Sequence, residues 1–296
     1  MENTVVEWRG VVKRRERMTL GPVDIELREN HVTALIGRNG SGKSTLMKLA
    51  AGLIYPDAGE ISWFGSAYPD GIPAEVRTRM SYVPENFATE EDGIKMDAAA
   101  EFRSFWYPSW DWQRYEELLR KFEVPGGKRL DKLSKGQRRK FEIAAALAVR
   151  PKLLLLDEPS SGLDPFAWKT MLEEIRRCVE EDRATVLLST HIVEEVRRMA
   201  DYLLLLDGGR SLGIREKDAL LDAGREVWIE DDEELVRELP GVTEWARESE
   251  GMIRFVTTDY AGAAALLGEA GVRPIRARAL ELDEMMEHWM EGRLSS

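Results

Sequence analysis

Residues 37–44 read GRNGSGKS, a match to the pattern G-x-x-x-x-G-K-S/T, whose backbone wraps around a phosphate group. An apolar run at 32–36 precedes this loop, and the segment TLMKLAAGL that follows has apolar residues at helical spacing. A strand, a glycine loop and a helix in this order bring several N–H groups and the positive end of the helix to one point. The residues predicted to bind a nucleotide there are Gly37, Asn39, Gly40, Ser41, Gly42, Lys43, Ser44 and Thr45.

Four side chains have specific predicted roles in phosphate chemistry. Lys43 is expected to hold the β- and γ-phosphates of ATP, and the Ser44 hydroxyl to bind Mg²⁺. LLLLDEP, residues 153–159, is predicted to be a buried strand that delivers Asp157 to its carboxyl end, the edge where open α/β sheets bind ligands. We expect Asp157 to hold Mg²⁺ through water and Glu158 to act as general base on the attacking water. The alternative is that the two acids only cap a strand.

Outward from these motifs, buried strands alternate with helices. The pattern predicts strands at 153–156, 185–188 and 202–206, and helices at 135–149 and 193–199. Such alternation is typical of an α/β fold, with a mostly parallel sheet covered by helices on both sides.

The chain of 296 residues is long enough for one large and one small domain. We expect a first domain at 1–215, with an aromatic, charged, helical subdomain inserted at about 87–150. From about residue 216 to 296 the pattern predicts a small accessory α+β domain. Its predicted strands are 227–229, 253–257 and 272–277, and its predicted helices are 232–239, 261–270 and 283–291.

Charge and composition limit the classes of function. The formal charge of −12 disfavours a nucleic acid partner, because phosphate backbones recruit proteins through an excess of Lys and Arg. Cys178 is the single cysteine, which excludes an internal disulfide and a thiolate metal cluster. No apolar run approaches the ~20 residues that span a bilayer, and the amino terminus lacks a secretory signal pattern. We therefore expect a cytoplasmic protein.

Three further motifs resemble those of one family. LSKGQ, residues 133–137, resembles the LSGGQ signature of ABC ATPases, with a lysine in place of the third-position glycine. SSGLD, residues 160–164, resembles the D-loop of that family, and STH, residues 189–191, its switch-histidine segment. With the glycine loop and LLLLDEP, five motifs follow the order of the family along the chain.

The resemblance implies an ABC nucleotide-binding domain with an N-terminal antiparallel β part and the inserted helical subdomain. It implies Mg-ATP hydrolysis by a dimer, formed with itself or with a homologous subunit, that acts on an integral membrane permease subunit from the inner face of the cell membrane. Asp164 would lie in the D-loop, and His191 would contact the γ-phosphate and orient the water. The residues implied to face ATP on the other subunit are Ser134, Lys135, Gly136 and Gln137.

Two positions depart from the pattern of the family. Glu85 stands where the family usually has a Gln that senses Mg²⁺. A carboxylate can still ligate the metal, so we expect Glu85 to take part in the metal site and in catalysis. No aromatic residue lies at 13–15, where the family stacks adenine. The candidates for the stacking group are therefore the Arg14 guanidinium and Trp8. Trp8 could instead be a core residue.

Two segments indicate the direction of transport. The aromatic run from Phe102 to Tyr115 resembles a segment of ABC-2-type exporter ATPases, and its rings are expected either to form a groove for the membrane subunit or to fill the subdomain core. ALELDEMM, residues 279–286, resembles the ending of drug- and lipid-exporting members. We therefore expect an exporter subunit. The alternatives are a soluble ABC ATPase that remodels a ribosome or DNA, and a regulatory module that holds ATP without turnover.

Overall fold

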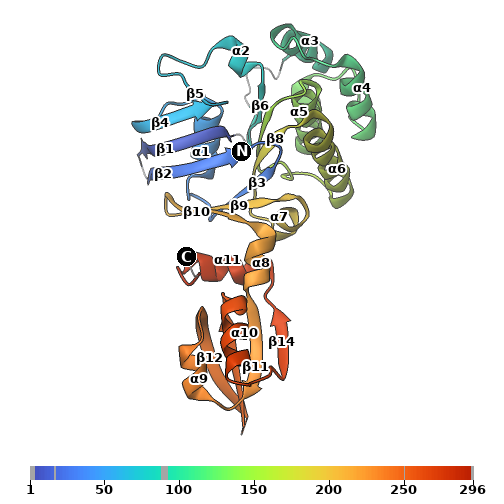
Figure 1. Ribbon diagram of the computed structural model, residues 1–296. Helices are drawn as coiled ribbons and strands as arrows, with labels where there is room; N and C mark the ends of the chain where they lie inside the picture. Colours follow the sequence, from blue (N-terminus) through green and yellow to red (C-terminus); the bar gives the residue numbers. More distant parts are fainter. Residues whose placement is uncertain (1–3, 17, 88–92, 250, 295–296) are drawn as a thin grey trace. The chain divides into compact units, whose positions relative to one another are not determined.

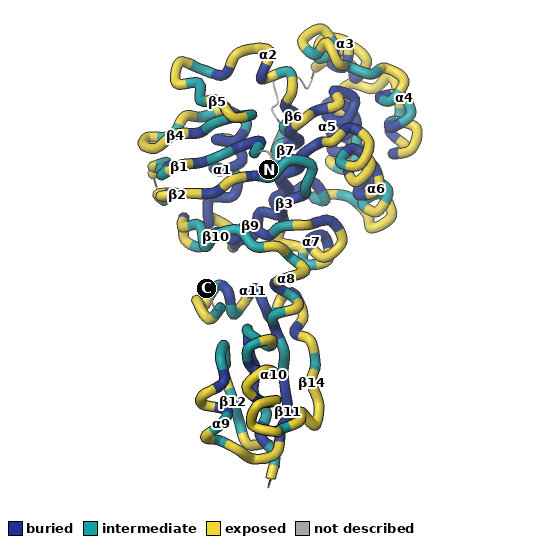
Figure 2. The backbone as a smooth tube through the Cα atoms, in the orientation of Figure 1, coloured by how far each residue is buried: buried dark blue, intermediate teal, exposed yellow. Residues whose placement is uncertain are grey.

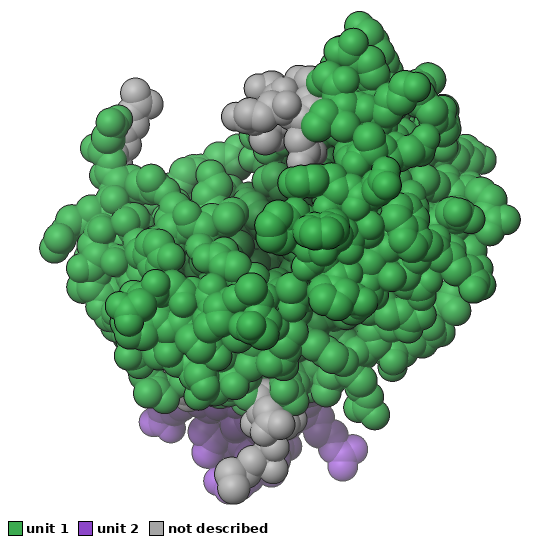
Figure 3. All heavy atoms as spheres, turned by 90° about the horizontal axis from the view of Figure 1, so that it is seen from above, with its two compact units in different colours: residues 1–213 green, residues 214–296 purple. Residues whose placement is uncertain are grey.

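The computed structural model describes residues 4–16, 18–87, 93–249 and 251–294. The chain forms two compact units, residues 1–213 and 214–296, which Figure 3 shows in separate colours. Each unit has a hydrophobic core of its own.

The larger sheet of the first unit has six strands in the order β10-β9-β3-β8-β7-β6 (Figure 1). These strands are β3 (Val32–Ile36), β6 (Met80–Val83), β7 (Leu153–Asp157), β8 (Thr185–Ser189), β9 (Tyr202–Asp207) and β10 (Arg210–Glu216). The strands from β9 to β6 pair in parallel. β3, β7 and β8 are buried along their whole length, because both faces of the sheet are covered.

A second sheet of this unit is antiparallel, with the strand order β2-β1-β4-β5. Its strands are β1 (Thr4–Arg15), β2 (Met18–Arg28), β4 (Ala58–Trp63) and β5 (Ser66–Ala67). Helix α1 (Lys43–Ala50) shares one core with both sheets, since its Leu46 packs in the same cluster as Val6 of β1 and Leu155 of β7. This packing anchors the glycine loop, which leads from β3 directly into α1.

Helices α5 (Lys135–Ala148) and α6 (Pro165–Asp182) cover the other face of the parallel sheet. The remaining helices of this unit are α2 (Ala74–Arg77), α3 (Met96–Trp106), α4 (Trp112–Lys121), a 3-10 turn (Leu130–Lys132) and α7 (Val193–Met199). Phe141 of α5 and Ile175 of α6 pack with Leu154 and Leu156 of β7 in one core. α5 is mostly buried, whereas α3 is largely exposed (Figure 2).

The second unit has an antiparallel sheet in the order β12-β13-β11-β14. Its elements are α8 (Lys217–Ala223), β11 (Arg225–Glu230), α9 (Glu233–Glu238), β12 (Val242–Ser249), β13 (Met252–Thr257), α10 (Tyr260–Glu269), β14 (Arg276–Ala279) and α11 (Leu282–Met290). Ile229 and Phe255 on one sheet face share a core with Leu267 of α10. On the other face, Glu226 pairs with Arg254 and with Arg278, both at 2.8 Å.

The second unit differs from the sequence-based prediction at three places, and the first is α8 at 217–223, where no helix was predicted. No strand was predicted at 242–249, where β12 lies, because this segment has few large apolar residues in alternation. The last strand was predicted to begin at Val272, but β14 begins at Arg276. The Val272 N–H donates to the Leu267 carbonyl at 2.9 Å, so this residue closes the end of α10 instead.

Candidate functional site

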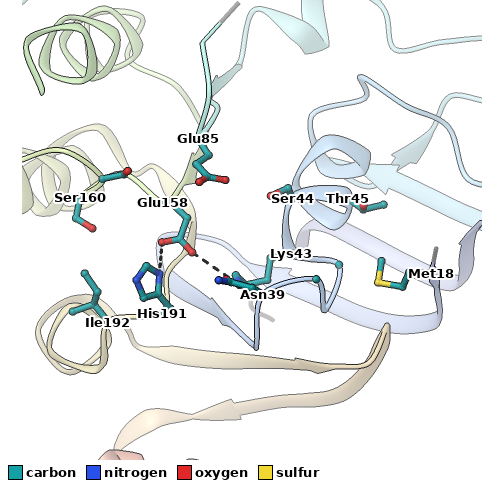
Figure 4. A pocket seen from close by; sticks show the side chains of 13 residues that line it. Met18, Asn39, Lys43, Ser44, Thr45, Glu85, Glu158, Ser160, His191 and Ile192 are labelled. Carbon is teal, nitrogen blue, oxygen red and sulfur yellow. Dashed lines mark hydrogen bonds and ion pairs between the residues drawn. The ribbon is translucent and has the colours of Figure 1, made fainter. Parts of the chain in front are cut away.

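A cavity of about 600 Å³ opens where β3, β7 and β8 end (Figure 4). It is formed by the glycine loop with the start of α1, by the loops after β6, β7 and β8, and by the start of β2. The lining residues are Met18, Asn39, Gly40, Gly42, Lys43, Ser44, Thr45, Glu85, Glu158, Ser160, Ser161, His191 and Ile192. Side chains far apart in the sequence therefore meet around one space.

The glycine loop needs its glycines for two different reasons. Gly40 and Gly42 have φ of +83° and +108°, which glycine adopts without strain. A Cβ on Gly37 would lie 2.3 Å from the Leu206 carbonyl oxygen, so close packing excludes any side chain there. α1 begins at Lys43 without a side-chain cap. The first N–H groups of α1 therefore form an open anion site at the cavity wall.

A buried cation and an imidazole flank the Glu158 carboxylate (Figure 4). Lys43 Nζ donates to the Gly37 carbonyl at 2.8 Å and lies 4.0 Å from Glu158 Oε1. Glu158 Oε2 is 2.8 Å from His191 Nδ1. Burial raises the pKa of Glu158, and His191 and Lys43 only partly offset this effect.

The backbone at the end of β7 separates the two acids of LLLLDEP. Glu158 has φ of +49°, a left-handed conformation that costs a residue with a Cβ about 1–2 kcal/mol. Its N–H donates to the carbonyl and hydroxyl oxygens of Ser189, both at 3.1 Å, and these bonds hold the conformation. Asp157 is buried and accepts a hydrogen bond from the same hydroxyl. Glu158 thus lines the cavity, whereas Asp157 does not.

The loop after β6 brings Glu85 to the cavity wall. Arg139 of α5 holds this loop, because its buried guanidinium donates to the carbonyl oxygens of Pro84 at 2.6 Å and Glu85 at 2.5 Å. The Glu85 backbone is therefore tied to α5, the helix that begins beside Ser134.

The oxygen donors at this wall fit Mg²⁺ by their chemistry. Ser44 and Glu85 both line the cavity, and Asp157 lies one residue before the lining Glu158. Mg²⁺ takes oxygen ligands, usually one or two carboxylates together with phosphates and water. Among the residues that the structure describes, no cluster of three His, Cys, Asp or Glu side chains could hold a metal by itself.

The start of α5 is capped within its own helix. The Ser134 hydroxyl accepts from the Gln137 N–H at 3.2 Å, and the Gln137 side chain accepts from the Ser134 N–H at 3.1 Å. Residues 134–137 do not line the cavity of their own chain.

The segment at 160–164 packs closely against this helix start. Lys135 Nζ donates to the Ser161 hydroxyl at 2.8 Å, and a Cβ on Gly136 would lie 2.5 Å from the Gly162 carbonyl oxygen. Asp164 caps α6, where its carboxylate accepts from the N–H groups of residues 166 and 167 at 3.0 and 2.9 Å. These backbone hydrogen bonds lower the pKa of Asp164.

The two groups considered for adenine stacking differ in position. Trp8 is 1% exposed and belongs to the core of the first unit, so it is not a stacking group. Arg14 is exposed, and its N–H donates to Asp57 Oδ2 at 2.6 Å. Met18 lines the cavity on the β2 side. It was not predicted, because a lone methionine carries no motif. Ser160 and Ser161 belong to the predicted D-loop segment, and Ile192 follows the switch-histidine segment.

The aromatic run of the helical part divides between core and surface. Tyr115, at the end of the run, is 3% exposed, and Phe122 beyond it is 2% exposed. Phe102, Phe105 and Trp106 of α3 are 63%, 82% and 59% exposed. Tyr115 therefore fills the core, as one interpretation of the run expected, and the groove for a membrane subunit stays a prediction for the exposed rings of α3. Every helix in the described ranges is too short or too polar to span a bilayer.

Comparison with protein families gives two matches. The model described as ABC transporter matches residues 20–161. A model of an AAA domain matches residues 126–197.

Curated relatives include ATP-binding subunits of both export and import transporters. The chain is 30% identical to Nod factor export ATP-binding protein I of Cupriavidus pinatubonensis, over 91% of this chain and 86% of that protein. It is 33% identical to the sulfate/thiosulfate import ATP-binding protein CysA of Caulobacter vibrioides, over 71% of this chain and 64% of that protein.

Solved structures share the fold of the first unit. An ATP-binding subunit of an ABC transporter matches with a TM-score of 0.66 and 30% identity, over 74% of this chain and 92% of that one. A bacterial ABC transporter cassette described as dimeric matches with a TM-score of 0.61 and 21% identity, over 71% and 98% of the two chains.

Proposed function

The chain belongs to the ATP-binding subunits of ABC transporters, which bind and hydrolyse ATP, and we propose that two such subunits close around Mg-ATP to drive export through a separate membrane subunit. One observation carries the proposal. The glycine loop, Glu158 and His191 line one cavity, and residues 134–137 of the same chain do not. A second subunit would supply the missing wall, and ATP would favour the closed pair because it binds that state better.

Within one subunit the glycine loop would bind the phosphates. The uncapped start of α1 offers N–H groups, and Lys43 would exchange the Gly37 carbonyl for the β- and γ-phosphates. Ser44, Glu85 and Asp157 would hold Mg²⁺, which when bound neutralises phosphate charge. The other residues proposed to contact the nucleotide are Gly37, Asn39, Gly40, Ser41, Gly42 and Thr45.

Glu158 is proposed as the general base. Its left-handed backbone turns the carboxylate into the cavity, where it can accept a proton from a water molecule facing the γ-phosphate. His191, at 2.8 Å from Oε2, would fix the orientation of the carboxylate and contact the γ-phosphate and the attacking water. Glu85 would assist at the metal.

The start of α5 would complete the site of the other subunit. Ser134 and Lys135 are exposed there, and a helix start attracts anions. Gly136 and Gln137 would keep this start close to the D-loop and capped. Asp164 would shape the D-loop between the two copies, which are either identical or homologous.

The export direction is inferred from the name of a relative, and the membrane partner from the exposed aromatic surface of α3. A relative that aligns over most of the chain is an export subunit, although an import subunit also matches. Exposed aromatic side chains often mark interfaces, so Phe102, Phe105 and Trp106 are proposed to contact the membrane subunit. The chain would then work at the inner face of the cell membrane.

The central experiment is the substitution Glu158→Gln, with the exposed α6 variant Glu180→Gln as matched control. Loss of a general base should lower ATP turnover about 100-fold or more. The variant should still bind Mg-ATP and elute as a dimer in its presence. Turnover equal to that of the control would remove Glu158 as base, and a monomer at saturating ATP would contradict the closed pair.

A second experiment tests the partner. A tagged chain purified from detergent-solubilised membranes should retain an integral membrane protein, and the triple variant Phe102→Ser, Phe105→Ser, Trp106→Ser should lose it. Co-sedimentation with ribosomes in place of a membrane protein would favour the soluble remodelling alternative.

A further inference from the structure

A buried carboxylate lies directly behind the turn that carries His191. Glu195, in the first turns of α7, is 1% exposed, and Thr190 is fully buried. The Thr190 hydroxyl donates to Glu195 Oε2 at 2.5 Å. A carboxylate buried at this depth costs folding free energy unless hydrogen bonds compensate it. This cost suggests that Glu195 has a role other than stabilising the fold.

The hydrogen bonds of Thr190 enclose His191 from both sides. The Thr190 hydroxyl accepts from the Ile192 N–H at 3.0 Å, which bridges the turn across His191. The Thr190 N–H donates to the Leu35 carbonyl of β3 at 3.2 Å, which joins the turn to the strand before the glycine loop. The bond to the Ile192 N–H depends on the orientation of the Thr190 hydroxyl, which Glu195 Oε2 sets, while the backbone bond to Leu35 fixes the position of residue 190.

The imidazole itself has little packing to hold it. The His191 side chain is 65% exposed, and its Nδ1 lies 2.8 Å from Glu158 Oε2. An exposed ring on a turn takes its position from the backbone beneath it. The Thr190 hydroxyl and Glu195 therefore determine where the imidazole stands relative to Glu158.

The second carboxylate oxygen of Glu195, Oε1, is less well satisfied than Oε2. Oε1 is buried and has no hydrogen-bond partner of normal geometry among the described residues. Burial raises the pKa of the Glu195 carboxyl, and the hydroxyls of Ser160 and Thr190 only partly offset this rise. Ser160 also lines the cavity, and it shares a second pocket of about 290 Å³ with Glu195 and Ile192.

We propose that Glu195 is a positioning residue for ATP hydrolysis, which holds the His191 turn through Thr190. This inference rests on the proposed role of His191. Glu195 has no contact with the cavity itself, so it would affect the rate of the reaction and leave nucleotide binding nearly unchanged.

The test is steady-state ATP hydrolysis by purified variants of the full chain. Glu195→Ala and Thr190→Val should lower kcat about 10- to 100-fold, the cost of a small misplacement of a catalytic group, with KM for ATP within about threefold of the parent. Glu195→Gln and Thr190→Ser keep the oxygen that each bond needs and should recover most of kcat. Glu194→Ala removes an exposed neighbour that pairs with Arg198 on the same helix and should have no effect.

Three outcomes would overturn the proposal. One is an unchanged kcat in Glu195→Ala. Another is a Gln variant as impaired as the Ala variant. The third is a parallel rise in KM with a lower melting temperature, because that pattern indicates general loss of structure.

A double variant separates this proposal from the role of His191. If Glu195 acts through His191, then Glu195→Ala should add nothing to the effect of His191→Ala. Additive effects would refute the positioning role while the role of His191 stands. A His191→Ala variant with normal kcat would instead refute the proposed function of His191, and with it the route by which Glu195 acts.

Discussion

Two helices of the first unit begin at motifs rich in glycine and serine, but their first turns are built differently. α1 follows Gly42, has no side-chain cap and carries the buried Lys43 at its start. α5 follows Ser134, which forms a complete capping box with Gln137, and it carries the exposed Lys135. The start of α1 leaves its N–H groups available for a ligand. At the start of α5, the Ser134 hydroxyl already accepts a hydrogen bond from one of the N–H groups. We therefore expect α1 to supply most of the ATP affinity and α5 to supply the contact that forms only when two subunits meet.

The largest expected effect is at the start of α1. Lys43→Ala removes a buried ammonium whose charge-assisted hydrogen bonds are each worth about 1.5–3 kcal/mol, so Mg-ATP affinity should fall at least 10- to 100-fold. Lys48→Ala, an exposed change in the last turn of α1, is the control and should leave affinity within about twofold. Isothermal titration measures both. Equal losses in the two variants would mean that overall charge, not the helix start, binds the phosphates.

A somewhat smaller effect is expected at the start of α5. A Cβ on Gly136 would lie 2.5 Å from the Gly162 carbonyl oxygen, and such overpacking costs about 1–3 kcal/mol. Gly136→Ala should therefore lower turnover roughly tenfold, while the affinity of the single subunit for ATP is retained. Gly268→Ala, where a Cβ would meet no atom within 4 Å, is the matched control and should be neutral. Loss of ATP affinity in Gly136→Ala would remove the distinction between the two helix starts.

The capping box at the start of α5 should contribute measurably to the thermal stability of the chain. Ser134→Ala removes the side-chain acceptor for the Gln137 N–H, which costs about 1 kcal/mol, or roughly 2–4 °C in Tm for a domain of this size. Ser134→Asp keeps an acceptor and should restore most of the loss. Thermal unfolding without nucleotide gives the comparison, and an unchanged Tm in the Ala variant would show that the cap contributes nothing.

The smallest expected effect is the pH dependence of stability at Glu158. Its pKa in the folded chain is raised above the usual 4.5, so the folded state binds the proton more tightly than the unfolded state does. The stabilisation this gives is present below the unfolded pKa and is lost as pH rises through the folded pKa. Glu158→Gln should therefore raise Tm slightly at neutral pH, and the gain should shrink as pH falls toward 4.5. A gain of the same size at every pH would contradict the raised pKa.

How far the sequence could predict the site is clear at the two acids of LLLLDEP. Their presence and their place after a buried strand follow from the motif and from apolar patterning. The sequence does not show that Glu158 lines the cavity while Asp157 does not. This difference depends on Ser189, which hydrogen-bonds to the Glu158 N–H and to the Asp157 carboxylate. Ser189 lies on a neighbouring strand, and no local pattern links it to β7.

The helical part shows the same limit. Tyr115 and Phe105 belong to one aromatic run, yet one is buried and the other is among the most exposed rings of the chain. Which of these rings meets the core depends on how α3 and α4 pack on the rest of the unit, and that packing joins segments distant in the sequence. The sequence also left open whether Trp8 stacks on adenine or lies in the core, and the structure places it in the core.

The sequence by itself determined the glycine loop, the order of strands and helices around it and the identity of the groups that meet a phosphate, because these depend on short-range backbone geometry and local hydrophobic patterning. Only the tertiary structure decided that Arg139 holds the loop of Glu85 and that Glu195 lies behind His191. The physical reason is that such contacts join distant segments. Hydrogen bonding and packing select them only after the whole core has formed.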